Sequence, residues 1–262
     1  MLGPVLIVIA ALVGIVSAMT GLGGGFLIVP FLVLLFDLEI HQAVGTSLVM
    51  IIFTAASATF AYARQKRIDY KVSMILSVGT VPGAVVGAYL TTLISGKLLS
   101  ALFGVFLLII ALQMVRRDYK IARSETGLRR TLVDSKGVSF DYTARVAPGL
   151  LLSFLGGVAS GFFGVGGGVV MVPVMVMVVG MPFHLAVAAS MFIMLFTSIS
   201  GAATHLSFGN IVPVYAFYLS IGIVLGTQIG AAVARRLRHR VVQTLFATFL
   251  SIVGIRMILG LF

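Results

Sequence analysis

The sequence predicts an all-α integral membrane protein made of two inverted-topology repeats, each a glycine-broken helical hairpin plus three transmembrane helices. Three observations carry this prediction. Of the 262 residues, 60% are hydrophobic and only 10% are charged. The apolar residues fall in runs, several of them long enough to cross a bilayer, and the second half of the chain repeats the first at a constant offset of 143 residues. We therefore expect a multi-pass protein of the cell membrane.

The composition excludes several classes of protein. Soluble domains average about 25% charged residues, so a chain with so few cannot cover its surface with polar groups. The chain has no cysteine, which excludes disulfides, thiolate metal sites and cysteine nucleophiles. The net charge is +11, but the basic residues lie in the gaps between apolar runs, as in the cytoplasmic loops of membrane proteins. We expect the lipid bilayer, and no nucleic acid, as the partner of these charges.

The apolar runs define the expected helices in chain order. Six runs are long enough to cross about 30 Å of hydrocarbon, namely 41–63, 71–94, 98–115, 184–204, 214–234 and 241–261. The other four form two hairpins, each with its arms joined by a glycine cluster: 2–20 with 24–36, and 146–163 with 167–180. The hydrophilic stretch 116–145 is expected to be a cytoplasmic connector, too short and too polar for a domain of its own. The predicted units are residues 1–115, 116–145 and 146–262.

The two repeats align without a gap. Gly14, Ser17, Gly21, Gly23, Gly24, Gly25 and Pro30 match Gly157, Ser160, Gly164, Gly166, Gly167, Gly168 and Pro173, and further on His41, Ser47 and Thr54 match His184, Ser190 and Thr197. Chance matches among Gly, Val and Ala are common in such a composition, whereas a shared His and a shared Pro in one register are not. The sequence therefore predicts an internal duplication.

The distribution of charge predicts that the repeats are inverted. The basic gaps are 64–71, 116–145 and 235–240, and the gaps without Lys or Arg are 37–40 and 205–213. We place the basic gaps inside and the others outside. With these sides fixed, the run 184–204 crosses once, so 146–180 must return to the side that it left. Because 2–36 does the same, each half crosses the membrane an odd number of times.

The two glycine clusters predict the functional site. Residues 20–25 read Thr-Gly-Leu-Gly-Gly-Gly, and residues 163–168 read Phe-Gly-Val-Gly-Gly-Gly. A helix does not readily continue through three glycines, and unwound backbone is tolerated in a bilayer only where protein or water surrounds it. The helix that restarts after each cluster presents free N–H groups to an anion. Paired half-helix N-termini near the midplane are a known transporter arrangement.

Close helix packing is the alternative explanation for such glycines. We prefer it for the two series with a spacing of four residues, which are Gly79, Gly83 and Gly87 and their matches Gly222, Gly226 and Gly230. For the clusters, their duplication at equivalent positions favours a ligand site instead.

Candidate substrate-binding residues are the cluster glycines and the hydroxyls in or near the same spans. They are Ser17, Thr20, Gly21, Gly23, Gly24, Gly25, Thr46, Ser47, Ser160, Gly164, Gly166, Gly167, Gly168 and Ser190. Each hydroxyl has the alternative of bonding to its own helix backbone. His41 and His184 begin equivalent runs, where an interfacial or capping role competes with proton transfer or gating.

Residues for enzyme chemistry are missing from the sequence. No Asp or Glu lies within an apolar run, so a carboxylate relay for protons or cations has nothing to be built from. There is no Walker motif, no His/Cys cluster and no plausible catalytic triad. We therefore expect no enzyme activity, no metal and no cofactor.

The pattern Gly14-x-x-Ser17-x-x-x-Gly21-x-Gly23-Gly24-Gly25, with Pro30 and then His41-x-Ala43-Val44-Gly45-Thr46-Ser47, resembles the TauE/SafE family of membrane permeases. The second-half version fits the same family, and the resemblance covers essentially the whole chain. It implies a secondary permease for a small oxyanion, sulfite or an organosulfonate, held between the two glycine-broken helix N-termini at the repeat interface. A proton or sodium ion is the candidate coupling ion.

Two other classes of function stay open from the residues alone. One is an anion channel that uses the same site as a constriction, and the other is a non-transporting membrane scaffold that uses 116–145 as a docking surface. The sequence does not specify the anion, the direction of transport or the oligomeric state.

Overall fold

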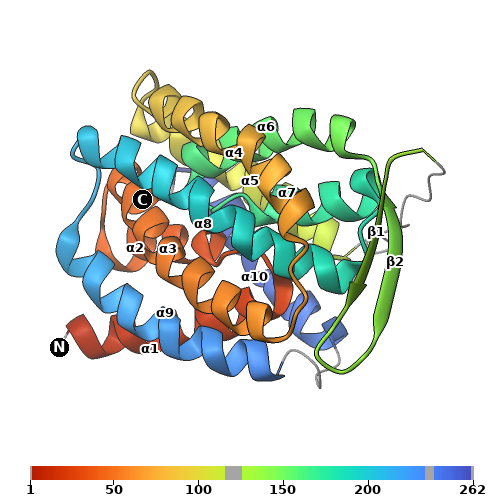
Figure 1. Ribbon diagram of the computed structural model, residues 1–262. Helices are drawn as coiled ribbons and strands as arrows, with labels where there is room; N and C mark the ends of the chain where they lie inside the picture. The colour runs from red at the N-terminus through yellow and green to blue at the C-terminus, as the bar shows by residue number, and fades with distance from the viewer. Residues whose placement is uncertain (1, 116–125, 234–238, 261–262) are drawn as a thin grey trace.

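The computed structural model describes residues 2–115, 126–233 and 239–260 as a bundle of helices with a small β-hairpin at one end (Figure 1). The first half contains α1 (Leu2–Thr20), α2 (Gly25–Phe36), α3 (Ile40–Arg64), α4 (Tyr70–Thr91) and α5 (Gly96–Val115). The second half contains α6 (Val146–Phe163), α7 (Gly168–Val174), the π-helix η1 (Met175–Val179), α8 (Phe183–Ser207), α9 (Pro213–Val233) and α10 (His239–Ile258). Between the halves lie strands β1 (Leu128–Val133) and β2 (Ser139–Ala144).

Seven helices in the described residues are long and apolar enough to cross a membrane, as expected of an integral membrane protein. Five of them, α3, α4, α5, α8 and α9, correspond to predicted spans. The other two, α1 and α6, are predicted only as hairpin arms, although a helix of 18–19 residues extends about 28 Å. The second arms are shorter, as predicted. The sixth predicted span, 241–261, overlaps α10, and its last residue lies outside the described residues.

Each main helix pair joins one helix of the first half to one of the second, and we call these the exchanged pairs. α1 lies on α9 and α4 lies on α6, while α3 packs on α8 and α5 on α10. The glycines spaced by four residues lie in the first two contacts. A methyl group at Gly83 would meet the Phe154 carbonyl oxygen, and one at Gly226 would meet the Ala11 carbonyl oxygen. These glycines therefore serve close helix packing, as the sequence predicts.

The connector contains a β-hairpin that the sequence interpretation misses. β1 and β2 pair antiparallel, with Leu128 opposite Ala144 and Val133 opposite Ser139. Half-buried and exposed residues alternate along β1, because a strand that packs one face points successive side chains to opposite sides. The expectation of a purely helical chain is thus incomplete between residues 128 and 144. Residues 116–125 of the predicted connector lie outside the described residues.

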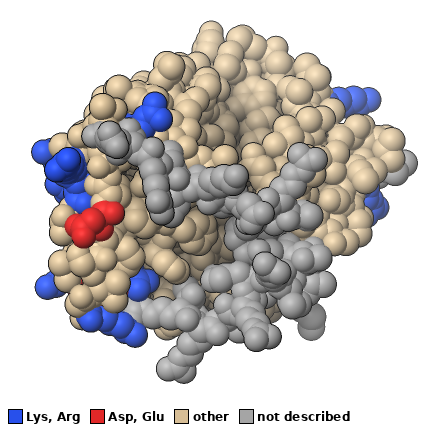
Figure 2. All heavy atoms as spheres, turned by 90° about the vertical axis from the view of Figure 1, so that its right-hand side faces the viewer, with Lys and Arg blue, Asp and Glu red and all other residues tan. Residues whose placement is uncertain are grey.

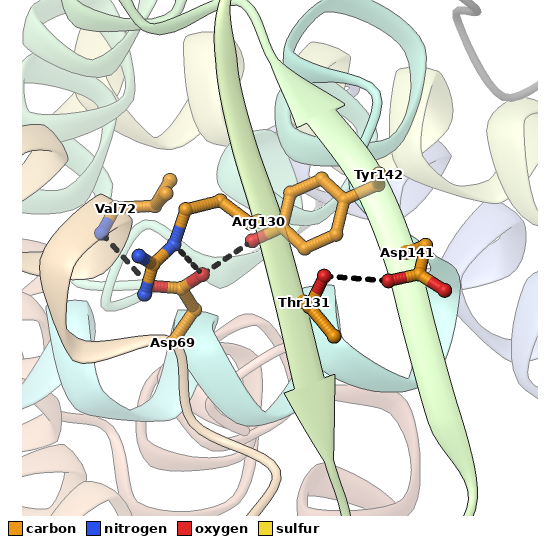
Figure 3. A network of polar contacts seen from close by, with 6 residues as sticks. All are labelled: Asp69, Val72, Arg130, Thr131, Asp141 and Tyr142. Atoms are coloured by element: carbon orange, nitrogen blue, oxygen red, sulfur yellow. Dashed lines mark hydrogen bonds and ion pairs between the residues drawn. The ribbon is translucent and has the colours of Figure 1, made fainter.

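A buried carboxylate fixes the hairpin to the start of α4. Arg130 of β1 donates to the two oxygens of Asp69 at 2.8 and 3.0 Å, and the Tyr142 hydroxyl of β2 donates to Asp69 at 2.8 Å (Figure 3). Asp69 also accepts from the Val72 N–H at 3.2 Å and so caps α4. Burial raises the pKa of the Asp69 carboxyl, but these hydrogen bonds outweigh burial and hold the pKa below its ordinary value.

The hairpin marks one end of the bundle. Figure 2 views this end, where more Lys and Arg than Asp and Glu side chains lie at the surface. The hairpin tip contacts the loop after α3, where Arg67 pairs with Asp134 at 3.1 Å. At the start of α6, the Arg145 N–H donates to the carbonyl oxygen of Val179, four residues before α8 begins, at 3.0 Å. Helix α3 therefore ends, and α8 begins, at the hairpin end.

Candidate functional site

Each glycine cluster forms a tight turn between two helices. In the first turn, Gly21, Gly23 and Gly24 have φ angles of 77°, 86° and 80°. The glycines at equivalent places in the second turn have φ angles of 66°, 76° and 81°. A left-handed backbone costs other residues about 1–2 kcal/mol each, so three such positions in one turn require glycine. The glycine pattern shared by the two halves is thus a shared backbone geometry.

Both turns end at the N-terminus of a short helix. α2 begins after its N-cap Gly24 and α7 after its N-cap Gly167, and no side chain caps either helix. α7 continues directly into η1, so the second helical segment runs over Gly168–Val179. Within the described chain, the N–H groups of residues 23–26 and 166–169 donate to no backbone or side-chain acceptor. Such N–H groups, at the positive end of a helix dipole, attract anions.

The backbones of the two turns touch each other. A methyl group at Gly25 would collide with the carbonyl oxygen of Gly164, and one at Gly168 would collide with the carbonyl oxygen of Gly21. The first helical residue of each short helix therefore lies against the turn of the other half. The sequence places the two clusters at equivalent positions, and the fold brings them into direct contact.

A serine from the opposite half supports each turn. The Ser47 hydroxyl on α3 donates to the Gly164 carbonyl oxygen at 2.7 Å, and the Ser190 hydroxyl on α8 donates to the Gly21 carbonyl oxygen at 3.0 Å. Each hydroxyl also lies within 2.8 Å of the carbonyl oxygen three residues earlier in its own helix. A serine hydroxyl has only one proton to donate, and these two carbonyl oxygens already accept it. Both residues lie at the turns, as expected of site residues, and here they hold the turn backbone.

Two other serines lie beside the N-caps, and their hydroxyls are unpaired in the described residues. Ser17 on α1 and Ser160 on α6 are 0% exposed, and neither hydroxyl has a hydrogen-bond partner among the described residues. A methyl group at Gly24 would lie 3.4 Å from Cβ of Ser17, and one at Gly167 would lie 3.5 Å from Cβ of Ser160. The Thr20 hydroxyl, in contrast, donates to a carbonyl of its own helix at 2.9 Å. Ser17 and Ser160 are therefore the hydroxyls available to a ligand at the turns.

Two apolar side chains fill the space between the turns. A methyl group at Gly166 would lie 2.6 Å from the Met194 sulfur on α8 and 2.8 Å from Cγ2 of Ile51 on α3, and one at Gly23 would also meet the Met194 sulfur. Ile51 and Met194 are fully buried and occupy equivalent positions in the two halves. Sequence reasoning misses them because an aliphatic or thioether side chain in an apolar run looks like any core residue. The offset of 143 residues is the signal that pairs them.

Three predicted candidates lie away from the turns. The Thr46 hydroxyl accepts a hydrogen bond from the Val212 N–H at 3.0 Å, in the loop between α8 and α9. His41 lies at the start of α3, where Nε2 is 3.1 Å from the Thr91 carbonyl oxygen, and it lines an open cavity of about 930 Å³. His184 is exposed at the start of α8. The structure thus gathers the glycines and four serines and leaves Thr46 and the histidines elsewhere.

The surroundings of the turns carry no acidic side chain from the helices. As bounded in the structure, α1 to α10 contain no Asp or Glu. In the described residues, no group of three or more His, Asp or Glu side chains lies close enough together to hold a metal ion. An anion at the turns would therefore meet backbone dipoles and hydroxyls without a fixed negative charge from a helix.

Comparison with known proteins decides the family. The profile described as "Sulfite exporter TauE/SafE" matches residues 6–257, nearly the whole chain. The protein belongs to the TauE/SafE family. This is a family of membrane transporters and not an enzyme class, and the protein is accordingly a multi-pass membrane protein.

Two curated TauE/SafE relatives match over almost their full length. The chain is 34% identical to "Probable membrane transporter protein YunE" of Bacillus subtilis (strain 168), over 97% of this chain and 96% of the relative. It is 27% identical to "Probable membrane transporter protein MJ0441" of Methanocaldococcus jannaschii, over 98% of this chain and 95% of the relative. No solved structure matches the chain significantly.

Proposed function

We propose that this TauE/SafE protein is a secondary permease for a small oxyanion, sulfite or an organosulfonate, and that it holds the anion between the two glycine turns. The family description names a sulfite exporter, and the relatives are named as probable membrane transporters. The geometry of the turns supports the anionic class of substrate independently, because free N–H groups and the Ser17 and Ser160 hydroxyls can all donate hydrogen bonds there.

The matched pair of unpaired hydroxyls carries the proposal. Ser17 and Ser160 each lie beside the N-cap of a short helix whose first N–H groups are free. A buried hydroxyl without a partner costs about 1–3 kcal/mol, and an oxyanion oxygen relieves that cost at both places. Sulfite and sulfonate groups carry three oxygens, so one such group can accept hydrogen bonds from both turns. Helix N-termini stabilise this charge without a lysine or arginine.

We further propose that the two halves are inverted repeats with the site at mid-depth. Helix α3 ends and α8 begins at the hairpin end, so these equivalent helices run in opposite directions. The exchanged pairs α1 with α9 and α6 with α4 are what a two-fold relation between the halves would produce. Ile51 and Met194, which lie against the turns, are each the twelfth residue of a helix of 25. This supports turns close to the bilayer midplane.

The basic hairpin end is proposed to face the cytoplasm. Arg67 and Arg130 lie there within ion pairs, and the predicted basic gap 64–71 meets the described part of the gap 116–145 at this end. In this orientation residues 1–115 and 146–262 form the two membrane repeats, and residues 116–145 form the cytoplasmic connector.

Transport by purified protein in proteoliposomes tests the proposal. The vesicles are incubated with radiolabelled sulfite, sulfate or methanesulfonate, and with rubidium as a cation control. We expect saturable uptake of sulfite or methanesulfonate that is accelerated by the same unlabelled anion on the opposite side. Equal fluxes of all four ions, or no flux above that of empty vesicles, would refute the proposal. Flux without acceleration by the opposing anion would indicate a channel. Repeating the assay with an imposed proton or sodium gradient identifies the coupling ion.

A further inference from the structure

We propose that Met194 and Ile51 form the gate between the two glycine turns, and that the Met194 thioether sets the size of the sulfonate that passes. This inference rests on the proposed oxyanion permease and concerns residues that its binding site does not include. The two side chains come from α8 and α3, the long helices that pack against each other between the exchanged pairs α1 with α9 and α4 with α6.

Met194 reaches both turns at once. Its sulfur is the nearest neighbour of a methyl group placed at Gly23 in the first turn and of one placed at Gly166 in the second. Its terminal methyl Cε would lie 2.5 Å from a methyl group at Gly168. The thioether therefore lies against glycines of both turns, and the N–H groups of these glycines are free. An anion that contacts both sets of N–H groups must move this side chain aside.

Ile51 closes the same space from the opposite helix. Its Cδ1 atom would lie 2.7 Å from a methyl group at Gly25, and its Cγ2 atom 2.8 Å from one at Gly166. Both Ile51 and Met194 are at most 1% exposed, so the space between the turns is sealed by apolar atoms. With both side chains in place, we infer that water and anions do not reach the N–H groups.

The two gate residues differ in how easily they move. Ile51 is branched at Cβ and is confined to few rotamers. Met194 is unbranched, has three rotatable bonds, and adapts its shape at low cost. The Met194 side chain is therefore the moving part of the gate, and Ile51 is the surface against which it closes. A flexible and a rigid side chain at equivalent positions are expected if the Met194 side chain moves and the Ile51 side chain remains in place.

A change in size selectivity is the signature of a gate. Met194→Ala removes the atoms that touch Gly23, Gly166 and Gly168, and we expect it to raise the transport rate of ethanesulfonate or propanesulfonate relative to sulfite by roughly tenfold or more. Met191→Ala is the matched control, because Met191 is equally buried on α8 but is not among the nearest neighbours of any turn glycine. A loss of packing alone would lower all rates together and would be similar in the two variants.

Chemical accessibility gives a readout that needs no transported substrate. The chain has no cysteine, so Met194→Cys and Met191→Cys each carry a single thiol. We treat both with the anionic reagent 2-sulfonatoethyl methanethiosulfonate in proteoliposomes. An open state populated at about 1–10% would make the thiol at position 194 react at least about tenfold faster than that at 191, and methanesulfonate should slow the reaction at 194 only.

The two experiments separate the gate from the permease. If wild-type protein transports oxyanions but the thiol at 194 is as unreactive as that at 191, and both alanine variants keep the wild-type size selectivity, the gate is refuted. If position 194 reacts selectively and no sulfonate protects it, and wild-type protein moves neither sulfonates nor sulfite, the position of the gate stands. The sulfonate size limit and the substrate class of the proposed function are then refuted.

Discussion

Gly167→Ala separates binding at the turns from the stability of the turns. Gly167 has a φ of 81°, and a methyl group there would have only the Gly156 carbonyl oxygen at 3.3 Å and Cβ of Ser160 at 3.5 Å as near neighbours. The methyl group fits once the Gly156 carbonyl oxygen shifts by a few tenths of an ångström, and the main cost is the left-handed backbone, about 1–2 kcal/mol. It also lies against Cβ of Ser160, beside the N-cap where the anion is proposed to bind. If the ligand loses two hydrogen bonds of about 1 kcal/mol each, its affinity falls roughly 30-fold.

Gly137→Ala is the matched control for the backbone cost. Gly137 lies in the turn of the β-hairpin with the same φ of 81°, and a methyl group there would have no neighbour within 4 Å. Both variants should lose similar thermal stability, measured by the unfolding midpoint in detergent. Only Gly167→Ala should lose sulfite or sulfonate binding, measured by substrate-induced thermal stabilisation and by uptake. Wild-type binding and transport by a folded Gly167→Ala protein would remove the second turn from the mechanism.

Four further predictions concern the turns, the buried Asp69 carboxylate and the orientation in the membrane. Ser17→Ala and Ser160→Ala should each weaken apparent substrate affinity about five- to tenfold. Neither should lower the unfolding midpoint, because neither hydroxyl has a hydrogen-bond partner to lose among the described residues. Unchanged affinity in both variants would contradict the proposed site. Gly25→Ala should fail to yield folded protein, since its methyl group would collide with the Gly164 carbonyl oxygen, and a monodisperse, active variant would show that the turns are not in contact. The pKa of Asp69 is lowered, so its contribution to stability is fully present above its ordinary value of 3.8 and is lost as the pH falls through the lower folded-state pKa. Unfolding midpoints measured from pH 3 to 7 should therefore fall at the acidic end, and Asp69→Asn should reduce this fall. Single cysteines at Asp37 and Asn210 should be labelled from outside intact cells and those at Lys66 and Ser135 should not, and the opposite labelling would reverse the proposed orientation.

The glycine turns were predictable because their backbone geometry demands a particular residue. Positive φ angles at Gly23, Gly24 and their matches leave a direct mark in the sequence, and duplication of that mark indicates a duplicated structure. The packing role of Gly83 and Gly226 was predictable for a similar reason, since close helix approach selects glycine at a spacing of four.

Contacts between distant segments could not be read from the chain. The hydrogen bonds of Ser47 and Ser190 to turns of the opposite half exist only because α3 and α8 pack together. Met194 and Ile51 carry no polar group that distinguishes them from the rest of an apolar run.

The β-hairpin is a different case, because the signal was present. Residues 139–144 alternate between polar and apolar, and Asp134 to Gly137 form a typical turn sequence before them. The overall polarity of 116–145 hides this local pattern.

A crystal structure with selenite, the selenium analogue of sulfite, tests the central claim most directly. Selenium is located by its anomalous scattering, and the chain contains no other selenium when it is produced with ordinary methionine. We predict one anomalous peak between the two turns, within hydrogen-bond distance of the Ser17 or Ser160 hydroxyl and of N–H groups in 23–26 and 166–169, with the Met194 side chain displaced. A peak elsewhere in the protein, with none at the turns at a selenite concentration that saturates transport, would contradict the account.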